Sequence, residues 1–169
     1  FQEVKEYQYF IRGVTVSGGE PTLQAGFIAE LFRRIKGELE LSCFVDTNGV
    51  FDMGAPEMQE LIESADKFMV DIKTVEPTAT LCGVEFTGHL KNLEELLKLG
   101  KVHEVRTVLI EGFMDMEKTV RTVKHLLKDY PEVEYRLIRV HPAGLDEERK
   151  ELIRSRVPQV DQMEGIKVT

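Results

Sequence analysis

Short β-branched runs alternate with longer stretches of helical periodicity along most of this chain of 169 residues. Strand-like runs occupy 13–16, 39–45, 68–72, 102–110 and 133–140, and helix-like stretches occupy 23–35, 56–65, 90–97, 116–130 and 145–153. Strands separated by helices pair in parallel, with right-handed crossovers. The sequence therefore predicts an α/β fold with about five parallel strands, as an open doubly wound sheet or as part of a (βα) barrel.

Composition excludes several classes of protein. Apolar residues make up 42% and charged residues 31%, as in ordinary globular domains. A net charge of −8 without a Lys/Arg block argues against a nucleic-acid partner. We see no apolar run long enough to span a bilayer and no signal peptide, so we expect no membrane association. The two cysteines, Cys43 and Cys82, form no ligand-spaced motif, and two unpaired thiols favour a reducing cytoplasm.

One segment is more indicative of a ligand-binding site than any other. It is residues 13–24, Gly-Val-Thr-Val-Ser-Gly-Gly-Glu-Pro-Thr-Leu-Gln. They place Glu20 at the carboxyl end of a strand, on a turn where Gly18 and Gly19 leave the backbone open to a ligand. An ionised Glu20 only accepts hydrogen bonds, so its partner should be a cation or a donor-rich group such as an ammonium. The structural alternative is a βα turn in which Pro21 simply starts a helix. The residues alone leave both interpretations open.

Other polar residues also fall at or near the carboxyl ends of predicted strands, where parallel α/β folds bind ligands. They are Asp46, Asp71, Lys73, Arg106 and His141. Each has a structural alternative: Asp46 is also typical of a turn or a helix cap. Arg106 could pair with Asp71 inside the protein, and His141 could be a loop residue before Pro142.

The string Phe10–Gln24 resembles the Gly-Gly-Glu segment of the radical S-adenosylmethionine (SAM) superfamily, and more specifically of the glycyl-radical-enzyme activating enzymes, which include the pyruvate formate-lyase activases. Further similar blocks follow in order at 43–49, 68–73, 104–112 and 139–142. The resemblance extends from about residue 10 to about residue 144.

The resemblance implies a partial TIM-type barrel. In that interpretation, residues 1–12 are the end of a preceding helix and 13–144 form the barrel without its first βα unit. Residues 145–169 are a C-terminal helix and tail. We therefore expect the strand at 13–16 to have an unpaired edge.

The resemblance also implies two cofactors, SAM and a [4Fe–4S] cluster. The cluster reduces SAM to a 5′-deoxyadenosyl radical, which takes a hydrogen atom from a backbone glycine of a partner glycyl radical enzyme. The electron would come from a donor such as flavodoxin or ferredoxin.

The same resemblance implies a set of SAM-binding residues at the Gly-Gly-Glu turn and at the strand ends. They are Ser17, Gly18, Gly19, Glu20, Asp46, Thr47, Asp71, Lys73, Arg106 and His141. Glu20 would hold the SAM ammonium. Asp46, Thr47, the Met69 carbonyl and Asp71 would hold a monovalent cation beside the SAM carboxylate. We therefore expect Asp46 and Asp71 to converge, because two nearby carboxylates need a cation or a proton between them.

The Cys-x-x-x-Cys-x-x-Cys loop that carries the cluster in that family does not occur in this sequence. Cys43 is interpreted as a core residue, and Cys82 has no nearby His or Cys. We expect the chain to be inactive by itself and the longer protein to be an enzyme. Two alternatives are a radical SAM enzyme acting on a small molecule, with contacts in 74–88, and a non-catalytic SAM- or nucleotide-binding module.

Overall fold

The computed structural model describes residues 1–76, 87–109, 114–139, 147, 151 and 167–168. They form one sheet of six parallel strands in the order β1-β2-β3-β4-β5-β6. The strands are β1 (Gly13–Val16), β2 (Ser42–Thr47), β3 (Lys67–Asp71), β4 (Val102–Leu109), β5 (Glu134–Arg139) and β6 (Lys167–Val168). A strand order that follows the chain order is that of a barrel segment, because a doubly wound sheet reverses its order partway. The barrel alternative is therefore confirmed.

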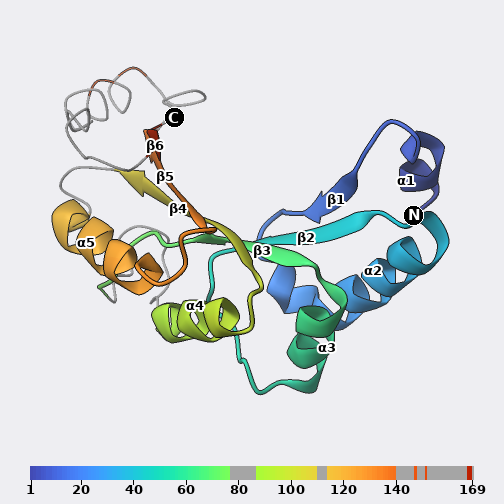
Figure 1. Cartoon of the computed structure of the whole chain (residues 1–169), viewed down its shortest axis with the longest axis horizontal. Coiled ribbons are helices and arrows are strands. Elements are labelled where there is room, and N and C mark those ends of the chain that lie inside the picture. Colours follow the sequence, from blue (N-terminus) through green and yellow to red (C-terminus); the bar gives the residue numbers. More distant parts are fainter. Residues whose placement is uncertain (77–86, 110–113, 140–146, 148–150, 152–166, 169) are drawn as a thin grey trace.

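The described helices between the strands lie on one side of the sheet. They are the 3₁₀ turn η1 (Pro21–Gln24), α2 (Ala25–Leu39), α3 (Pro56–Ser64), α4 (His89–Lys98) and α5 (Met116–Leu127). Figure 1 shows α2, α3, α4 and α5 together beneath a curved sheet, whose other side is concave and not covered by any of them. The short helix α1 (Gln2–Tyr7) lies beyond the start of β1.

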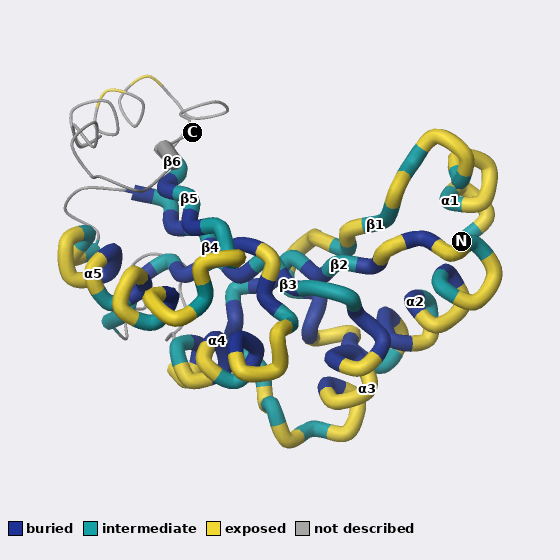
Figure 2. The backbone as a smooth tube through the Cα atoms, in the orientation of Figure 1, coloured by how far each residue is buried: buried dark blue, intermediate teal, exposed yellow. Residues whose placement is uncertain are grey.

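Alternation of side chains along the strands separates an apolar face from a polar one. In β2, Cys43 and Val45 are fully buried, whereas Phe44 and Asp46, which each follow one of them, are only half-buried. Successive residues of a strand point to opposite faces, so the buried set faces the helices and the other set faces the concave side. Figure 2 shows the buried segments concentrated between the sheet and the helices. Each helix contributes to this core: Phe32, Leu61, Leu93 and Val123 are fully buried.

Three features differ from the sequence-based expectations. Helix α2 continues to Leu39 and ends at Glu40, which adopts a left-handed conformation with φ of 55°. The strand expected at 39–45 therefore begins later, at Ser42, because Leu39 belongs to the apolar stripe of the helix. The short strand β6 was not predicted; it pairs with Arg136 and Leu137 of β5. Most of the predicted helix at 145–153 and most of the segment 74–88 lie outside the described residues.

Strand β1 forms one edge of the sheet, since among the described strands it pairs only with β2. The backbone N–H of Ser42 donates to the Arg12 carbonyl oxygen at 3.2 Å. A Cβ at Gly13 would lie 2.6 Å from the Ser42 oxygen, so the close approach of the two strands requires glycine there. A hollow of about 270 Å³ lies against this strand pair, lined by 12–15, Ser42 and Phe44. Within the described sheet, the expected unpaired edge is confirmed.

We expect this edge to bind a second copy of the chain, because it carries β-branched residues and no charge that would block strand addition. In a parallel pair, backbone groups of alternate residues face the neighbouring strand, so Arg12 and Val14 face β2 and Thr15 faces outward. Thr15→Pro should remove an outward N–H and weaken association without breaking the ladder. The control Val14→Pro removes an N–H on the β2 side and should destabilise the fold.

Sedimentation velocity over a range of concentrations measures this association. The expectation fails if the wild-type chain stays monomeric throughout, or if Thr15→Pro associates as strongly as wild type.

Candidate functional site

The carboxyl ends of β2, β3 and β4 bring three charged side chains together on the concave face. Asp46 is the register partner of Met69, and Asp71 is the register partner of Arg106. Each of the three charged residues follows a fully buried valine and therefore points away from the helices. The predicted convergence of Asp46 and Asp71 is confirmed by their shared contact with Arg106.

The guanidinium of Arg106 bridges the two carboxylates. Its Nε donates to Asp71 Oδ1 at 2.7 Å, and its Nη2 donates to Asp46 Oδ1. The Arg106 side chain is 18% exposed. Burial by itself would lower the pKa of Arg106, but the charges and hydrogen bonds of Asp71 and Asp46 raise it above its ordinary value. The pairing of Arg106 with Asp71, one of the two sequence-based alternatives, is thus present in the structure.

Two further predicted residues join this cluster at its periphery. Lys73 Nζ lies 3.5 Å from Asp71 Oδ2. Ser17, just after β1, donates through Oγ to Asp46 Oδ2 at 3.4 Å. We call Asp46, Asp71, Lys73 and Arg106 the ionic cluster. Through Ser17 it is connected to the Gly-Gly-Glu turn.

Sequence reasoning missed Glu104 and Arg136, which extend the cluster to β5. The Glu104 side chain is 6% exposed; its Oε1 lies 3.7 Å from Arg106 Nε and its Oε2 lies 2.8 Å from Arg136 Nε. Glu134 also pairs with Arg136, at 2.8 Å. The available signal was the two-residue spacing of Glu104 and Arg106 within one strand, which places both charges on one face.

Glu20 lies in a different assembly, where it accepts four hydrogen bonds. Its Oε1 accepts from the Thr22 N–H at 3.2 Å, the Thr22 hydroxyl at 2.7 Å and the Thr47 hydroxyl at 2.8 Å. Its Oε2 accepts from the Asn48 N–H at 2.9 Å. The carboxylate thus ties the turn after β1 to the end of β2, and its role as a ligand of the SAM ammonium stays a prediction. The Thr47 hydroxyl is directed to Glu20, whereas Asp46 faces the concave side.

The two glycines before Glu20 differ in what the fold requires of them. Gly18 has a φ of 140°, a conformation that favours glycine. Gly19 has no positive φ, and a Cβ at either position would meet nothing within 4 Å. Neither backbone conformation nor packing therefore explains the absence of a side chain at Gly19.

Side chains of helix α4 contact the backbone of two segments, the one that follows β2 and the one that follows β3. The Asn92 amide donates to the carbonyl oxygens of Gly49 at 2.9 Å and Phe51 at 2.8 Å. His89 Nε2 lies 2.7 Å from the Thr74 carbonyl oxygen. Burial lowers the pKa of His89, and the hydrogen bond to Thr74 opposes that shift.

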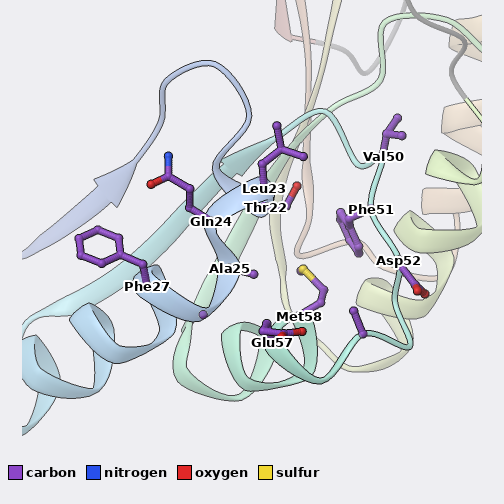
Figure 3. A pocket seen from close by; sticks show the side chains of 12 residues that line it. Thr22, Leu23, Gln24, Ala25, Phe27, Val50, Phe51, Asp52, Glu57 and Met58 are labelled. Carbon is purple, nitrogen blue, oxygen red and sulfur yellow. The ribbon is translucent and has the colours of Figure 1, made fainter.

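A hollow of about 550 Å³ lies outside this polar face, between the start of α2 and the segment after β2 (Figure 3). Leu23 and Phe27 line it and are 82% and 67% exposed. A second hollow, of about 340 Å³, is lined by residues 16–21 together with Leu23, Gln24, Phe27 and Ile28. The Gly-Gly-Glu turn therefore has an apolar surface beside it, distinct from the ionic cluster.

The described residues do not fit the ligands of an iron–sulfur cluster, because Cys43 is the one cysteine among them. No group of three His, Cys, Asp or Glu side chains among them could hold a metal ion. Cys43 is buried, as predicted, with Sγ 3.7 Å from the Leu41 carbonyl oxygen. Burial, reinforced by Asp66, raises the pKa of Cys43 to about 11, so the thiol stays protonated at neutral pH. Cys82 and His141 lie outside the described residues. In the part of the chain that the structure describes, no helix is long and apolar enough to cross a membrane.

Comparison with known proteins agrees with the resemblance. The family model "Radical SAM superfamily" matches residues 1–126. The chain is 36% identical to a putative glycyl-radical enzyme activating enzyme of Haemophilus influenzae, over 88% of this chain and 64% of that protein. It is 32% identical to pyruvate formate-lyase 1-activating enzyme of Escherichia coli, over 85% of this chain and 61% of that protein. The chain thus spans less than two thirds of these relatives.

Solved structures show the same fold. A domain of pyruvate-formate lyase-activating enzyme from Bacteroides vulgatus matches with a TM-score of 0.65 and 26% identity, covering 93% of this chain and 97% of that one. Streptococcus suis SuiB bound to S-adenosylmethionine matches with a TM-score of 0.61 and 14% identity, covering 90% of this chain and 38% of that one. The second match shows likeness of fold alone.

Glu20→Gln should destabilise the chain, because the amide NH₂ cannot accept the hydrogen bond of one of the four donors. We expect a loss of about 1–3 kcal/mol in the free energy of unfolding, measured by urea denaturation. The control Glu30→Gln, at an exposed position of α2, should stay within about 0.5 kcal/mol. A Glu20→Gln chain as stable as wild type would show that the four hydrogen bonds contribute nothing.

Stability should fall below about pH 6.5 through His89. The folded state lowers the pKa of His89, so the unfolded chain binds more protons in this range, and folding stability declines as pH falls. His89→Gln should reduce the loss of stability between pH 7 and pH 5, whereas the exposed His103→Gln should leave it unchanged. Equal pH dependence in wild type and His89→Gln would contradict this assignment.

Proposed function

This chain belongs to the radical SAM superfamily, and we propose that it is the SAM-binding part of an enzyme that activates a glycyl radical enzyme. SAM would bind at the carboxyl ends of β1–β4 on the concave face. The names of the relatives from H. influenzae and E. coli support the activating role. Because those relatives are longer than this chain, the activity of the whole protein is part of the proposal.

One observation carries the SAM site: the bare, uncrowded backbone of Gly19 lies at the carboxyl end of β1, next to a cluster of charged side chains. Ser17, two residues before Gly19, contacts this cluster through Asp46. A ligand with ammonium, carboxylate and sulfonium groups needs both an open backbone and charges of both signs. The turn and the cluster supply these next to each other.

In this proposal the described residues orient SAM. The backbone at Gly18 and Gly19 would lie against its methionyl part, with Glu20 and Thr47 keeping the turn in place. Asp46, Asp71, Lys73 and Arg106 would set the charge of the site. The role of His141 at the nucleoside stays a prediction, because that residue lies outside the described residues.

The proposed enzyme would have two protein partners, a substrate and an electron donor. A glycyl radical enzyme would be the polypeptide substrate, and a flavodoxin or ferredoxin would supply the electron. In this family the cluster provides the reductive cleavage of SAM. Since the described residues do not fit cluster ligands, we assign no step of that chemistry to them.

Gly19→Leu tests the site directly. A leucine side chain would cover the backbone and should weaken SAM binding by about tenfold or more, measured by isothermal titration of the 169-residue chain with SAM. The unfolding midpoint should not change, because the new Cβ meets no atom within 4 Å.

Gly37→Leu is the matched control, since a Cβ at that position of α2 also meets nothing within 4 Å. It should bind SAM like wild type. The proposal fails if the wild-type chain does not bind SAM, or if Gly19→Leu binds it with unchanged affinity.

A further inference from the structure

We propose that Asn92 of α4 is a positioning residue for the SAM site, because it fixes the segment that follows β2 and, through that segment, the Gly-Gly-Glu turn. The inference rests on the proposed function, since Thr47 and Glu20 are the groups that Asn92 would position. Asn92 acts through backbone hydrogen bonds, and we assign it no contact with SAM.

The side chain of Asn92 is bonded to the segment after β2 at two points. Its Nδ2 donates to the carbonyl oxygens of Gly49 at 2.9 Å and Phe51 at 2.8 Å. Asn92 is 6% exposed and lies on the buried face of α4, next to Leu93 and one turn before Leu96. A buried amide is costly unless it is hydrogen-bonded. The two bonds offset that cost and at the same time fix two carbonyl groups of one short loop.

From Gly49 the hydrogen bonds continue to the Gly-Gly-Glu turn. The Gly49 N–H donates to Thr47 Oγ1 at 3.1 Å, and the Thr47 hydroxyl donates to Glu20 Oε1 at 2.8 Å. The N–H of Asn48 donates to Glu20 Oε2 at 2.9 Å. The position of Gly49 therefore sets where Thr47 and Asn48 present their donors to the Glu20 carboxylate.

The backbone at Gly49 also lies directly against the first turn of α4. Gly49 has a φ of 77°, which favours glycine, and a Cβ there would lie 3.4 Å from both His89 Cβ and Val70 Cγ1. This contact keeps the loop from moving towards the helix, and the two bonds from Asn92 keep it from moving away. Loss of the Asn92 amide would release the loop without removing an apolar side chain from the core.

Amide hydrogen exchange of the 169-residue chain, followed by NMR, tests the inference in the absence of SAM. In the wild-type chain the amides of Asn48 and Gly49 should be protected by their hydrogen bonds. Asn92→Leu is similar in size but lacks the amide, so exchange at Asn48 and Gly49 should rise by about tenfold more than at Val105 in β4. Unprotected Asn48 and Gly49 amides in the wild type, or an equal rise at all three amides in Asn92→Leu, would overturn the inference.

Asn92→Ala keeps the test decisive if Asn92→Leu does not fold. Its smaller side chain leaves room for water at the two released carbonyl oxygens. We expect the same local rise of exchange at Asn48 and Gly49, and exchange like that of the wild type would overturn the inference.

Leu97→Ala is the matched control on the same face of α4, where Leu97 is 2% exposed. It should lower the midpoint of thermal unfolding by about 5 °C or more. Exchange at Asn48 and Gly49 should rise no more than at Val105, because the bonds from Asn92 remain. A local rise as large as that of Asn92→Leu would show that any weakening of α4 frees the loop, and would overturn the positioning role.

SAM titrations separate this inference from the proposed function. Asn92→Leu should bind SAM about tenfold more weakly than the wild type, whereas Leu97→Ala should bind it with unchanged affinity. Equal affinity of Asn92→Leu and wild type would overturn the inference. If the wild-type chain does not bind SAM, the proposed function fails, and the exchange measurements still decide whether Asn92 positions the segment after β2.

Discussion

The two-residue alternation of strand side chains organises both the core and the site. In β2, β3 and β4 the buried valines Val45, Val70 and Val105 face the helices, and each is followed by a charged residue on the other face. Because helices α2–α5 cover only one side of the sheet, the charged side stays open (Figure 1). The same pattern that builds the hydrophobic core thus collects Asp46, Asp71 and Arg106 on one concave surface.

This alternation also separates neighbours that sequence comparison groups together. Asp46 and Thr47 are adjacent, but Asp46 joins Arg106 on the concave side while Thr47 joins Glu20 at the turn. Two polar assemblies result, and Ser17 connects them, since it lies in the Gly-Gly-Glu segment and donates to Asp46. A ligand over this turn would lie between the backbone that Glu20 fixes and the charged side chains of Asp46, Asp71 and Arg106.

The sequence was sufficient to predict the parallel α/β architecture and the turn around Glu20, because both follow from local patterns and strand order. The convergence of Asp46 with Asp71 was expected from the family resemblance. It was insufficient for contacts that depend on distant donors. The hydrogen bonds from Thr47 and Asn48 to Glu20, and the ion pair of Glu104 with Arg136, join strands in a register that no local pattern specifies. Strand β6 consists of two residues, too few for a periodic signal.

The central claim is that SAM binds over Gly19 on the concave face. A crystal structure of the chain grown with SAM tests it most directly. The account predicts SAM against the Gly18–Gly19 backbone, beside Asp46, Asp71 and Arg106. SAM bound elsewhere on the chain, or no SAM bound at saturating concentration, would contradict it.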